Sequence, residues 1–221
     1  MIHRSKASIK GIVQGIGFRP FVYNLAKKRE LRGYISNTST GVDIEVEGEL
    51  EQIELFFKEI ENNHLPLARI TSIDKTFLSP INHQNFVIRE SISHSQKTVL
   101  IAPDICVCED CLREMRNPRD RRYRYPFINC TNCGPRYTII KDVPYDRPFT
   151  SMSVFQMCDD CLREYNDPAN RRFHAQPNAC PLCGPDVTLY DTQRRPVLSE
   201  NPISGAIELL KKGYILAIKG L

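Results

Sequence analysis

Eight of the nine cysteines in this 221-residue chain form four Cys-x-x-Cys pairs, and their spacing restricts the fold more than any other feature. The pairs are Cys108/Cys111, Cys130/Cys133, Cys158/Cys161 and Cys180/Cys183. Shifting the chain by 50 residues aligns residues 108–135 with residues 158–185, and 13 of those 28 positions are identical. A repeat of this kind indicates two copies of one structural unit.

Each repeat is predicted to be a zinc finger with four cysteine ligands. A two-residue spacer lets two sulfurs face one tetrahedral ion, and Gly134 or Gly184 permits the tight turn behind the second pair. Four thiolates leave no open coordination position, so both Zn²⁺ ions are expected to be structural. Spacing leaves consecutive or crossed pairing open. Consecutive pairing is favoured because each repeat is then self-contained, with a metal site independent of the other.

Two further residues near the fingers are potential ligands. Cys106 faces Gln156 in the repeat alignment and is expected to be a spare thiol. His174 aligns with Arg124, so contact with a neighbouring domain suits it better than metal binding.

The cellular compartment bears on this interpretation of the cysteines. The opening residues Met-Ile-His-Arg-Ser-Lys lack the apolar core of a signal peptide. No run approaches the roughly 18 apolar residues of a membrane helix. We therefore expect a cytoplasmic protein without membrane contact, in a reducing compartment that favours metal binding over disulfides.

The first 90 residues contain no cysteine and predict an α+β domain. Strands are expected at 8–13, 31–36, 41–47, 70–78 and 86–88, and helices at 20–28 and 49–61. The order β-α-β-β-α-β is that of a ferredoxin-like sandwich, an antiparallel sheet with two helices on one face. The expected units are a ferredoxin-like domain 1–90, linker 91–105, first finger 106–135, inter-finger segment 136–157, second finger 158–185 and a third part 186–221. The clearest linker signal is the small, polar stretch 91–97.

A glycine-rich turn connects the first strand to the first helix. Gly15 and Gly17 permit backbone angles that turn N–H groups inward, and the helix N-terminus adds partial positive charge. Arg19 adds a planar two-pronged donor suited to phosphate. The predicted phosphate-binding residues are Gln14, Gly15, Ile16, Gly17, Phe18 and Arg19.

This turn resembles the acylphosphatase signature, and the resemblance continues through residues 33–37 and 41–48. Arg19 and Asn37 fall on the two catalytic positions of that family. The resemblance implies metal-free hydrolysis of an acyl phosphate, in which Arg19 and the loop amides hold the phosphoryl group and Asn37 orients the attacking water. Taken alone, Asn37 indicates a turn residue.

Residues 123–130, 144–150 and 171–177 extend the resemblance, so the whole chain resembles the HypF family of carbamoyltransferases in [NiFe]-hydrogenase maturation. The resemblance implies an enzyme that uses carbamoyl phosphate and, in full-length members, ATP and Mg²⁺. Its product carries a carbamoyl group on the C-terminal cysteine of a HypE-like partner, the source of the cyanide ligands of the [NiFe] centre.

The C-terminal part is expected to begin a further domain of that family. After a helix around 203–212, residues 213–221 resemble the first strand of its YrdC-like domain. The chain is therefore expected to be an N-terminal fragment, limited to acyl-phosphate hydrolysis, with residues 215–221 poorly packed.

The competing interpretation is a nucleic-acid or protein binding module without catalysis. Its basis is a basic stretch interleaved with Tyr123, Tyr125 and Phe127. The arginines are Arg113, Arg116, Arg119, Arg121, Arg122 and Arg124. Residues 106–185 hold 12 basic and 10 acidic side chains, and the chain's net charge is only +4, which argues against nucleic acid.

Overall fold

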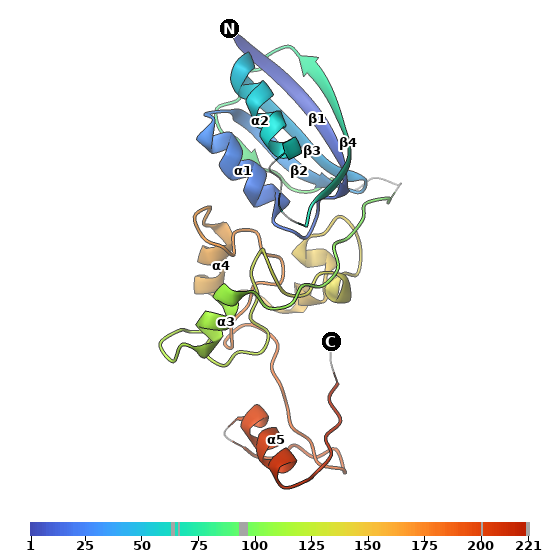
Figure 1. Cartoon of the computed structure of the whole chain (residues 1–221), viewed down its shortest axis with the longest axis vertical. Coiled ribbons are helices and arrows are strands. Elements are labelled where there is room, and N and C mark those ends of the chain that lie inside the picture. Colours follow the sequence, from blue (N-terminus) through green and yellow to red (C-terminus); the bar gives the residue numbers. More distant parts are fainter. Residues whose placement is uncertain (63–64, 66, 93–96, 200, 220–221) are drawn as a thin grey trace.

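The computed structural model describes residues 1–62, 65, 67–92, 97–199 and 201–219. The first part is a sheet covered on one face by two helices (Figure 1). The strands are β1 (Ile2–Ile12), β2 (Arg32–Thr38), β3 (Gly41–Glu49), β4 (Arg69–Leu78) and β5 (Phe86–Ile88), and the helices are α1 (Phe18–Lys28) and α2 (Leu50–Asn62). The predicted α+β, ferredoxin-like class is confirmed.

The sheet order is β4-β1-β3-β2-β5, with β1, β2, β3 and β4 pairing antiparallel. One expectation was wrong in detail: the sheet is not wholly antiparallel, because β5 pairs parallel to β2. The connection between β4 and β5 crosses from one edge of the sheet to the other. Glu47 of β3 accepts backbone N–H groups from Ile81, Asn82 and His83 at 3.1, 2.9 and 3.0 Å, which fixes that crossing.

The helices cover the sheet with apolar faces. The predicted α2 face, Ile53, Phe56, Phe57 and Ile60, is buried, and burial of each such side chain contributes about 1.5–3 kcal/mol. From α1, Phe18, Val22, Leu25 and Ala26 are buried in the same core. Phe18 directly precedes Arg19, so the packing of α1 also fixes the start of the predicted phosphate-binding helix.

The finger region has the same local structure in both repeats. Helices α3 (Glu109–Arg116) and α4 (Asp159–Asn166) each begin directly after the first cysteine of a pair and carry two acidic residues in the first turn. Carboxylates there complement the positive end of the helix. Between the repeats lie three short 3₁₀ helices, η1 (Tyr137–Ile139), η2 (Arg147–Phe149) and η3 (Ser151–Val154).

The C-terminal part contains the expected helix, α5 (Pro202–Lys211), at the far end of the molecule from the sheet (Figure 1). Asn201 caps it by accepting the backbone N–H groups of Ile203 and Ser204 at 2.9 and 3.1 Å. Residues 214–219 form no strand, and Ile215 is 97% exposed. The rest of the expected strand, residues 220–221, lies outside the described residues, as do residues 93–96 of the expected linker. None of the helices in the described part is long and apolar enough to span a bilayer.

Candidate functional site

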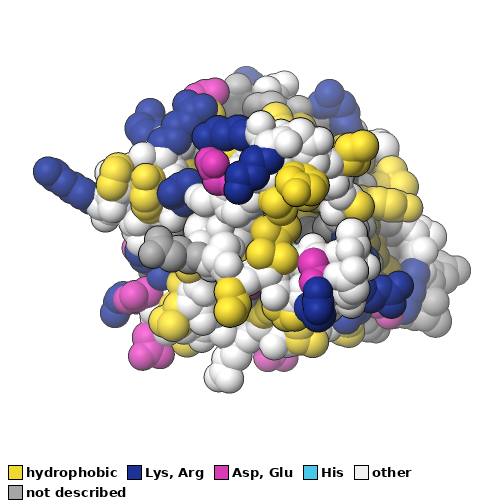
Figure 2. Space-filling model, turned by 90° about the horizontal axis from the view of Figure 1, so that it is seen from below, with side chains coloured by type: hydrophobic (Ala, Val, Ile, Leu, Met, Phe, Trp, Pro, Cys, Tyr) yellow, Lys and Arg dark blue, Asp and Glu magenta, His cyan; other side chains and the backbone are white. Residues whose placement is uncertain are grey.

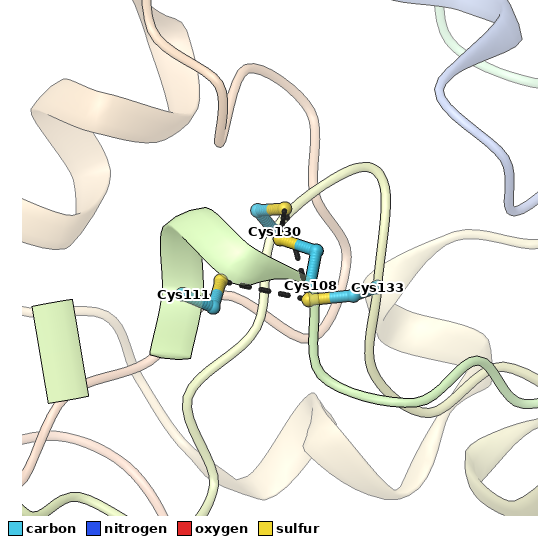
Figure 3. A group of neighbouring side chains, drawn as sticks. All are labelled: Cys108, Cys111, Cys130 and Cys133. Carbon is cyan, nitrogen blue, oxygen red and sulfur yellow. Dashed lines mark hydrogen bonds between the residues drawn. The ribbon is translucent and has the colours of Figure 1, made fainter. Parts of the chain in front are cut away.

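The cysteines gather into two groups in consecutive order. All four sulfurs of each group lie within 4.8 Å of one another. The groups are Cys108, Cys111, Cys130 and Cys133, and Cys158, Cys161, Cys180 and Cys183. Figure 3 shows how the first group combines the start of α3 with the loop that follows it. Cys106 belongs to neither group and is exposed.

The sulfur spacing fits one tetrahedral ion in each group. A Zn–S bond of about 2.3 Å places the sulfurs of a tetrahedron about 3.8 Å apart. The measured separations are 3.8 Å for Cys108–Cys130 and Cys130–Cys133 and 3.5 Å for Cys111–Cys133, then 3.7 Å for Cys158–Cys180 and Cys180–Cys183 and 3.6 Å for Cys161–Cys183. Four soft thiolate donors at this spacing suit Zn²⁺.

The two fingers are joined by arginines that cross from each repeat to the other's cysteines. Arg121 Nη2 donates to Cys161 Sγ at 3.0 Å, and Arg171 Nη2 donates to Cys111 Sγ at 3.2 Å. Residues 121 and 171 are equivalent, as are 111 and 161, so the exchange is reciprocal. Four thiolates around one divalent ion carry a formal charge of about −2, which the opposite finger's guanidinium partly offsets.

A second arginine from each repeat strengthens the exchange. Arg122 is 1% exposed and binds Glu164 Oε1 at 3.0 Å and Ala179 O at 2.9 Å. Its counterpart Arg172 is 3% exposed and binds Glu114 and, at 3.1 Å, Asn129 O. Each finger therefore takes its four cysteines from one repeat, as the favoured consecutive pairing predicted, but those cysteines also accept hydrogen bonds from the opposite repeat.

These contacts weaken the binding-module interpretation. Arg121 and Arg122 are committed to the opposite finger, Arg113 pairs with Asp110, and Tyr125 is buried beside the first cysteine group. On the face seen from below, basic side chains have acidic ones among them, and hydrophobic side chains occupy the middle (Figure 2). Two of the six arginines, Arg121 and Arg122, thus belong to the contact between the fingers, whereas Arg113, Arg116, Arg119 and Arg124 are exposed.

The glycine-rich turn lies between β1 and α1, where the finger region approaches it closely. Gly15 and Gly17 both have left-handed backbone, with φ of 75° and 76°. A Cβ at either position would lie 3.2 Å from a finger-region atom, Arg136 Cδ at Gly15 and Thr131 Cβ at Gly17. Both the turn and the domain contact therefore need glycine at these positions.

Arg19 stands in the first turn of α1 and is 8% exposed. Its Nη2 donates to Asp146 Oδ1 at 2.7 Å and, more weakly, to Tyr145 O at 3.4 Å; Nη1 lies 3.5 Å from Ser91 Oγ. Asp146 comes from the inter-finger segment. The ion pair fixes one edge of the guanidinium, and the described contacts leave Nε–H for a phosphoryl oxygen.

Asn37, near the end of β2, lies on the same side of the turn. Its Nδ2 faces Tyr145 O at 3.4 Å, and its Oδ1 is buried without a partner among the described residues. Tyr145 thus contacts both Arg19 and Asn37 through its carbonyl. A buried acceptor without a partner costs about 1–3 kcal/mol, so the Asn37 amide is arranged to bind something that enters the site.

A cavity of about 20 Å³ separates the turn from the finger region, enough space for about one water molecule. The first domain contributes Val13, Gln14, Gly15, Gly17, Phe18, Arg19, Pro20 and Asn37. The finger region contributes Thr131, Arg136, Tyr145, His174, Ala175, Gln176 and Pro177. The candidate site is therefore enclosed by both regions.

The predicted phosphate-binding residues separate into three kinds in the structure. The side chains of Ile16 and Phe18 belong to the core, and Ile16 is not among the cavity-lining residues. The Gln14 side chain is a structural support, because it hydrogen-bonds three backbone groups. Its Nε2 donates to Thr38 O and Gly41 O at 2.8 and 2.7 Å, and its Oε1 accepts Tyr145 N–H at 2.8 Å. All of these residues except Ile16 line the cavity, and Gly15, Gly17 and Arg19 do so without belonging to the core or acting as structural supports.

Sequence reasoning missed the finger-region half of this site. Arg136, 2% exposed, donates to Gly15 O and to Cys130 O and Thr131 O at 3.0 and 2.9 Å, which ties the turn to the first finger. Tyr145 and Asp146 lie in the 144–150 stretch, which falls outside the aligned repeats. A distinctive polar stretch without a repeat equivalent was the available signal.

Comparison with known proteins agrees with this arrangement. The acylphosphatase family model matches residues 5–88, and the HypF finger model matches residues 107–140 and 157–190. The chain is 37% identical over 91 residues to an acylphosphatase from Bacillus pumilus, of which it covers 99%.

Relatives that match the whole chain are much longer. A probable carbamoyltransferase HypF from Methanocaldococcus jannaschii is 49% identical over 98% of this chain, and carbamoyltransferase HypF2 from Cupriavidus necator is 48% identical over 99%. The chain spans 28% and 27% of their lengths. A crystal structure of full-length HypF in a phosphate- and nucleotide-bound form matches all of this chain and 29% of its own, with a TM-score of 0.93 and 49% identity. The chain belongs to the HypF family and corresponds to its acylphosphatase and zinc-finger regions.

Proposed function

We propose that this chain hydrolyses small acyl phosphates, with carbamoyl phosphate as its physiological substrate, as one step of HypF carbamoyl transfer. The observation that carries the proposal is the convergence of the Gly15–Gly17 turn, Arg19 and the unpartnered Asn37 amide on one enclosed cavity. These are the groups that a metal-free phosphoryl transfer to water needs.

Binding begins with the phosphoryl group. The turn and the N-terminal end of α1 direct backbone dipoles at it, and the free edge of Arg19 donates to its oxygens. Asp146 positions Arg19 through the 2.7 Å ion pair. These donors are fixed before substrate arrives, so they stabilise charge that develops on the phosphoryl oxygens without reorganising.

The reaction is an in-line attack by water. Asn37 Oδ1 accepts a hydrogen bond from the water, which aims the lone pair of the water at phosphorus. The new P–O bond forms as the bond between phosphorus and the acyl oxygen breaks. The electron pair leaves with the acyl carboxylate, and the water proton passes to the phosphate product. Carboxylate is a good leaving group, so no side-chain acid or base is required.

The finger region supports this site from outside. Each four-cysteine group would hold one Zn²⁺, which supplies folding energy to a region with little apolar core. ATP and Mg²⁺, the HypE-like acceptor and the hydrogenase cyanide ligands belong to the complete HypF reaction, in which we propose that this chain takes part. Thiolate metal sites also suit the reducing cytoplasm, where we propose that the protein acts.

The test is phosphate release from carbamoyl phosphate by the full chain, with a protein-free blank for spontaneous breakdown. Arg19→Ala and Asn37→Ala should each lower kcat by about 10²–10³-fold, the usual cost of a lost charge-stabilising donor or positioning group. Arg29→Ala is the matched control, because Arg29 ends α1 but pairs with Glu59 at 2.6 Å, away from the cavity. Turnover retained by a folded Arg19→Ala variant would refute the proposal.

A further inference from the structure

The cavity has two unlike walls, and only the turn side carries groups suited to phosphate. The opposite wall comes from Thr131 of the first finger, from the inter-finger segment and from residues 174–177 of the second finger. A phosphoryl group held by the turn and Arg19 leaves its acyl substituent against this second wall. Polar atoms there decide which acyl groups fit.

Most polar side-chain atoms of that wall are already engaged. Gln176 uses both ends of its amide, with Nε2 donating to His174 O at 2.7 Å and Oε1 accepting Arg147 N–H at 2.8 Å. Arg136 is occupied by backbone carbonyls, and Tyr145 OH faces Pro135 O at 3.4 Å. Thr131 Oγ1 donates to Arg171 O at 3.0 Å.

His174 is the exception. Its Nδ1 is buried without a hydrogen-bond partner, and among the described cavity-lining residues Asn37 alone shares this property. Each wall of the cavity therefore offers one unsatisfied atom. Leaving a polar atom buried and unpaired is costly, so each of the two atoms is available to a molecule that enters the cavity: the attacking water at Asn37 and a substrate group at His174.

The imidazole is held in place and kept neutral. Its ring lies 4.9 Å from the Tyr165 ring and 4.7 Å from the Phe173 ring between centroids. The backbone is left-handed, with φ of 53°, and the His174 N–H donates to Tyr165 O at 2.9 Å. Burial, helped by the charge of Arg19, lowers the pKa of His174 to about 4. A neutral ring has one N–H and one lone pair, so Nδ1 accepts a hydrogen bond when the N–H is on Nε2.

We propose that His174 is a specificity-determining residue whose Nδ1 accepts an N–H of the substrate's acyl group. This inference rests on the proposed function and narrows it to acyl phosphates that carry a nitrogen donor, namely carbamoyl phosphate. Acetyl phosphate has nearly the same shape but presents a methyl group. It leaves Nδ1 unpaired in the complex and is selected against for that reason.

The experiment compares kcat/KM for carbamoyl phosphate and acetyl phosphate, measured with this 221-residue chain. For His174→Ala, kcat/KM with carbamoyl phosphate should fall about tenfold, the effect of one buried hydrogen bond, while acetyl phosphate changes less than about twofold. Arg124→Ala is the matched control, because residue 124 has the same left-handed backbone, φ 57°, in the other repeat but contacts Ser204 of α5. In this control, kcat/KM with carbamoyl phosphate and kcat/KM with acetyl phosphate should both stay at the wild-type value.

A second variant and a measurement of metal content distinguish a loss of specificity from a loss of folding. His174→Gly is a second variant, since glycine adopts the left-handed backbone without strain and removes the ring nitrogen. It should reproduce the loss of preference with metal content unchanged. An unchanged carbamoyl-to-acetyl ratio in both variants, or equal losses with both substrates, would overturn the inference while leaving hydrolysis at Arg19 intact. A wild-type chain that turned over neither substrate would instead refute the proposed function itself.

Discussion

Arg124 and His174 occupy equivalent positions in the two repeats and have nearly the same left-handed backbone, with φ of 57° and 53°. Their backbone N–H groups also make the same contact, to Met115 O at 2.8 Å and Tyr165 O at 2.9 Å. Their surroundings differ completely. Arg124 donates to Ser204 of α5, whereas His174 lines the cavity beside Arg19. The repeat fixes local conformation, and the position of each copy relative to the first domain decides what its residues do.

The same comparison applies to the metal sites, which look equivalent but depend on each other. Each cysteine group accepts N–H···S bonds from the opposite repeat. Independence of the two copies would be expected if the repeats merely followed one another along the chain. Reciprocal contacts instead predict that removing the cysteines of one repeat weakens metal binding by the other repeat.

The largest effect should follow from removing one cysteine pair. Cys158→Ser with Cys161→Ser removes the metal of the second group, at a cost of about 10 kcal/mol or more of binding free energy. It also misplaces Arg171 and Arg172, which cover the first group. We expect a chelator to strip the remaining metal at least about tenfold faster than in the wild type, measured by metal analysis over time.

The reverse pair, Cys108→Ser with Cys111→Ser, is the matched comparison and should weaken the second site in the same way. One metal per chain that resists chelator as well as in the wild type would show that the sites are independent.

A smaller effect is expected from the buried arginines. Arg122→Gln and Arg172→Gln each leave a carboxylate without its main partner, which should destabilise the chain by about 3–5 kcal/mol in urea unfolding. Arg122 should be the more damaging, because it also binds Asn178 Oδ1 at 3.0 Å. Arg113→Gln, with a 74% exposed side chain, serves as control and should change stability by less than about 0.5 kcal/mol. Equal, small effects at all three positions would contradict the interlocked arrangement.

The smallest predicted difference concerns the stability of the folded chain at low pH. Burial opposes ionisation of Glu164, but hydrogen bonds from Arg122 and Arg121 outweigh it and lower its pKa to about 2. The pKa of Glu114 is also lowered, by Arg172 and Arg171 against the same opposition from burial. Since the folded-state pKa lies below the ordinary value of 4.5, Glu164 contributes stability above about pH 4.5, and this contribution is lost as pH falls towards 2.

Matched Glu164→Gln and Glu114→Gln variants test this difference by thermal unfolding from pH 7 to pH 3. Protonation of the cysteine ligands is common to both, so comparison of the variants isolates the carboxylates. Glu164→Gln should lower the free energy of unfolding by about 2 kcal/mol at pH 7. This difference from the wild type should decrease as the pH falls. A gap that stays constant with pH would mean that the Glu164 charge contributes nothing.

Much of the first domain could be predicted because its information is local. The apolar face of α2 follows from Ile53, Phe56, Phe57 and Ile60 at helical spacing, and all four are buried. The parallel pairing of β5 with β2 could not be predicted this way, because it depends on where the 79–85 connection crosses the sheet. Three residues of β5 carry no signal for the strand beside which they lie.

The same distinction between local and long-range information applies to the candidate site. Arg19 and the glycines that shape the turn were expected because one short stretch of sequence contains them. The opposite wall was not, since Asp146 and His174 lie 127 and 155 residues further along the chain and reach Arg19 only through domain packing. His174 was expected to contact a neighbouring domain, but its buried, unpartnered Nδ1 is visible only in three dimensions.

Sequence by itself determined the four Cys-x-x-Cys ligand pairs, because two cysteines separated by two residues can face one ion whatever surrounds them, but it left open how the pairs combine. It also determined the repeat and the glycine-rich turn, whose conformation depends on Gly15 and Gly17. Only the tertiary structure decided that the fingers exchange arginines and that the second one closes the cavity over Arg19. Those contacts depend on the docking of separate surfaces, which local spacing does not encode.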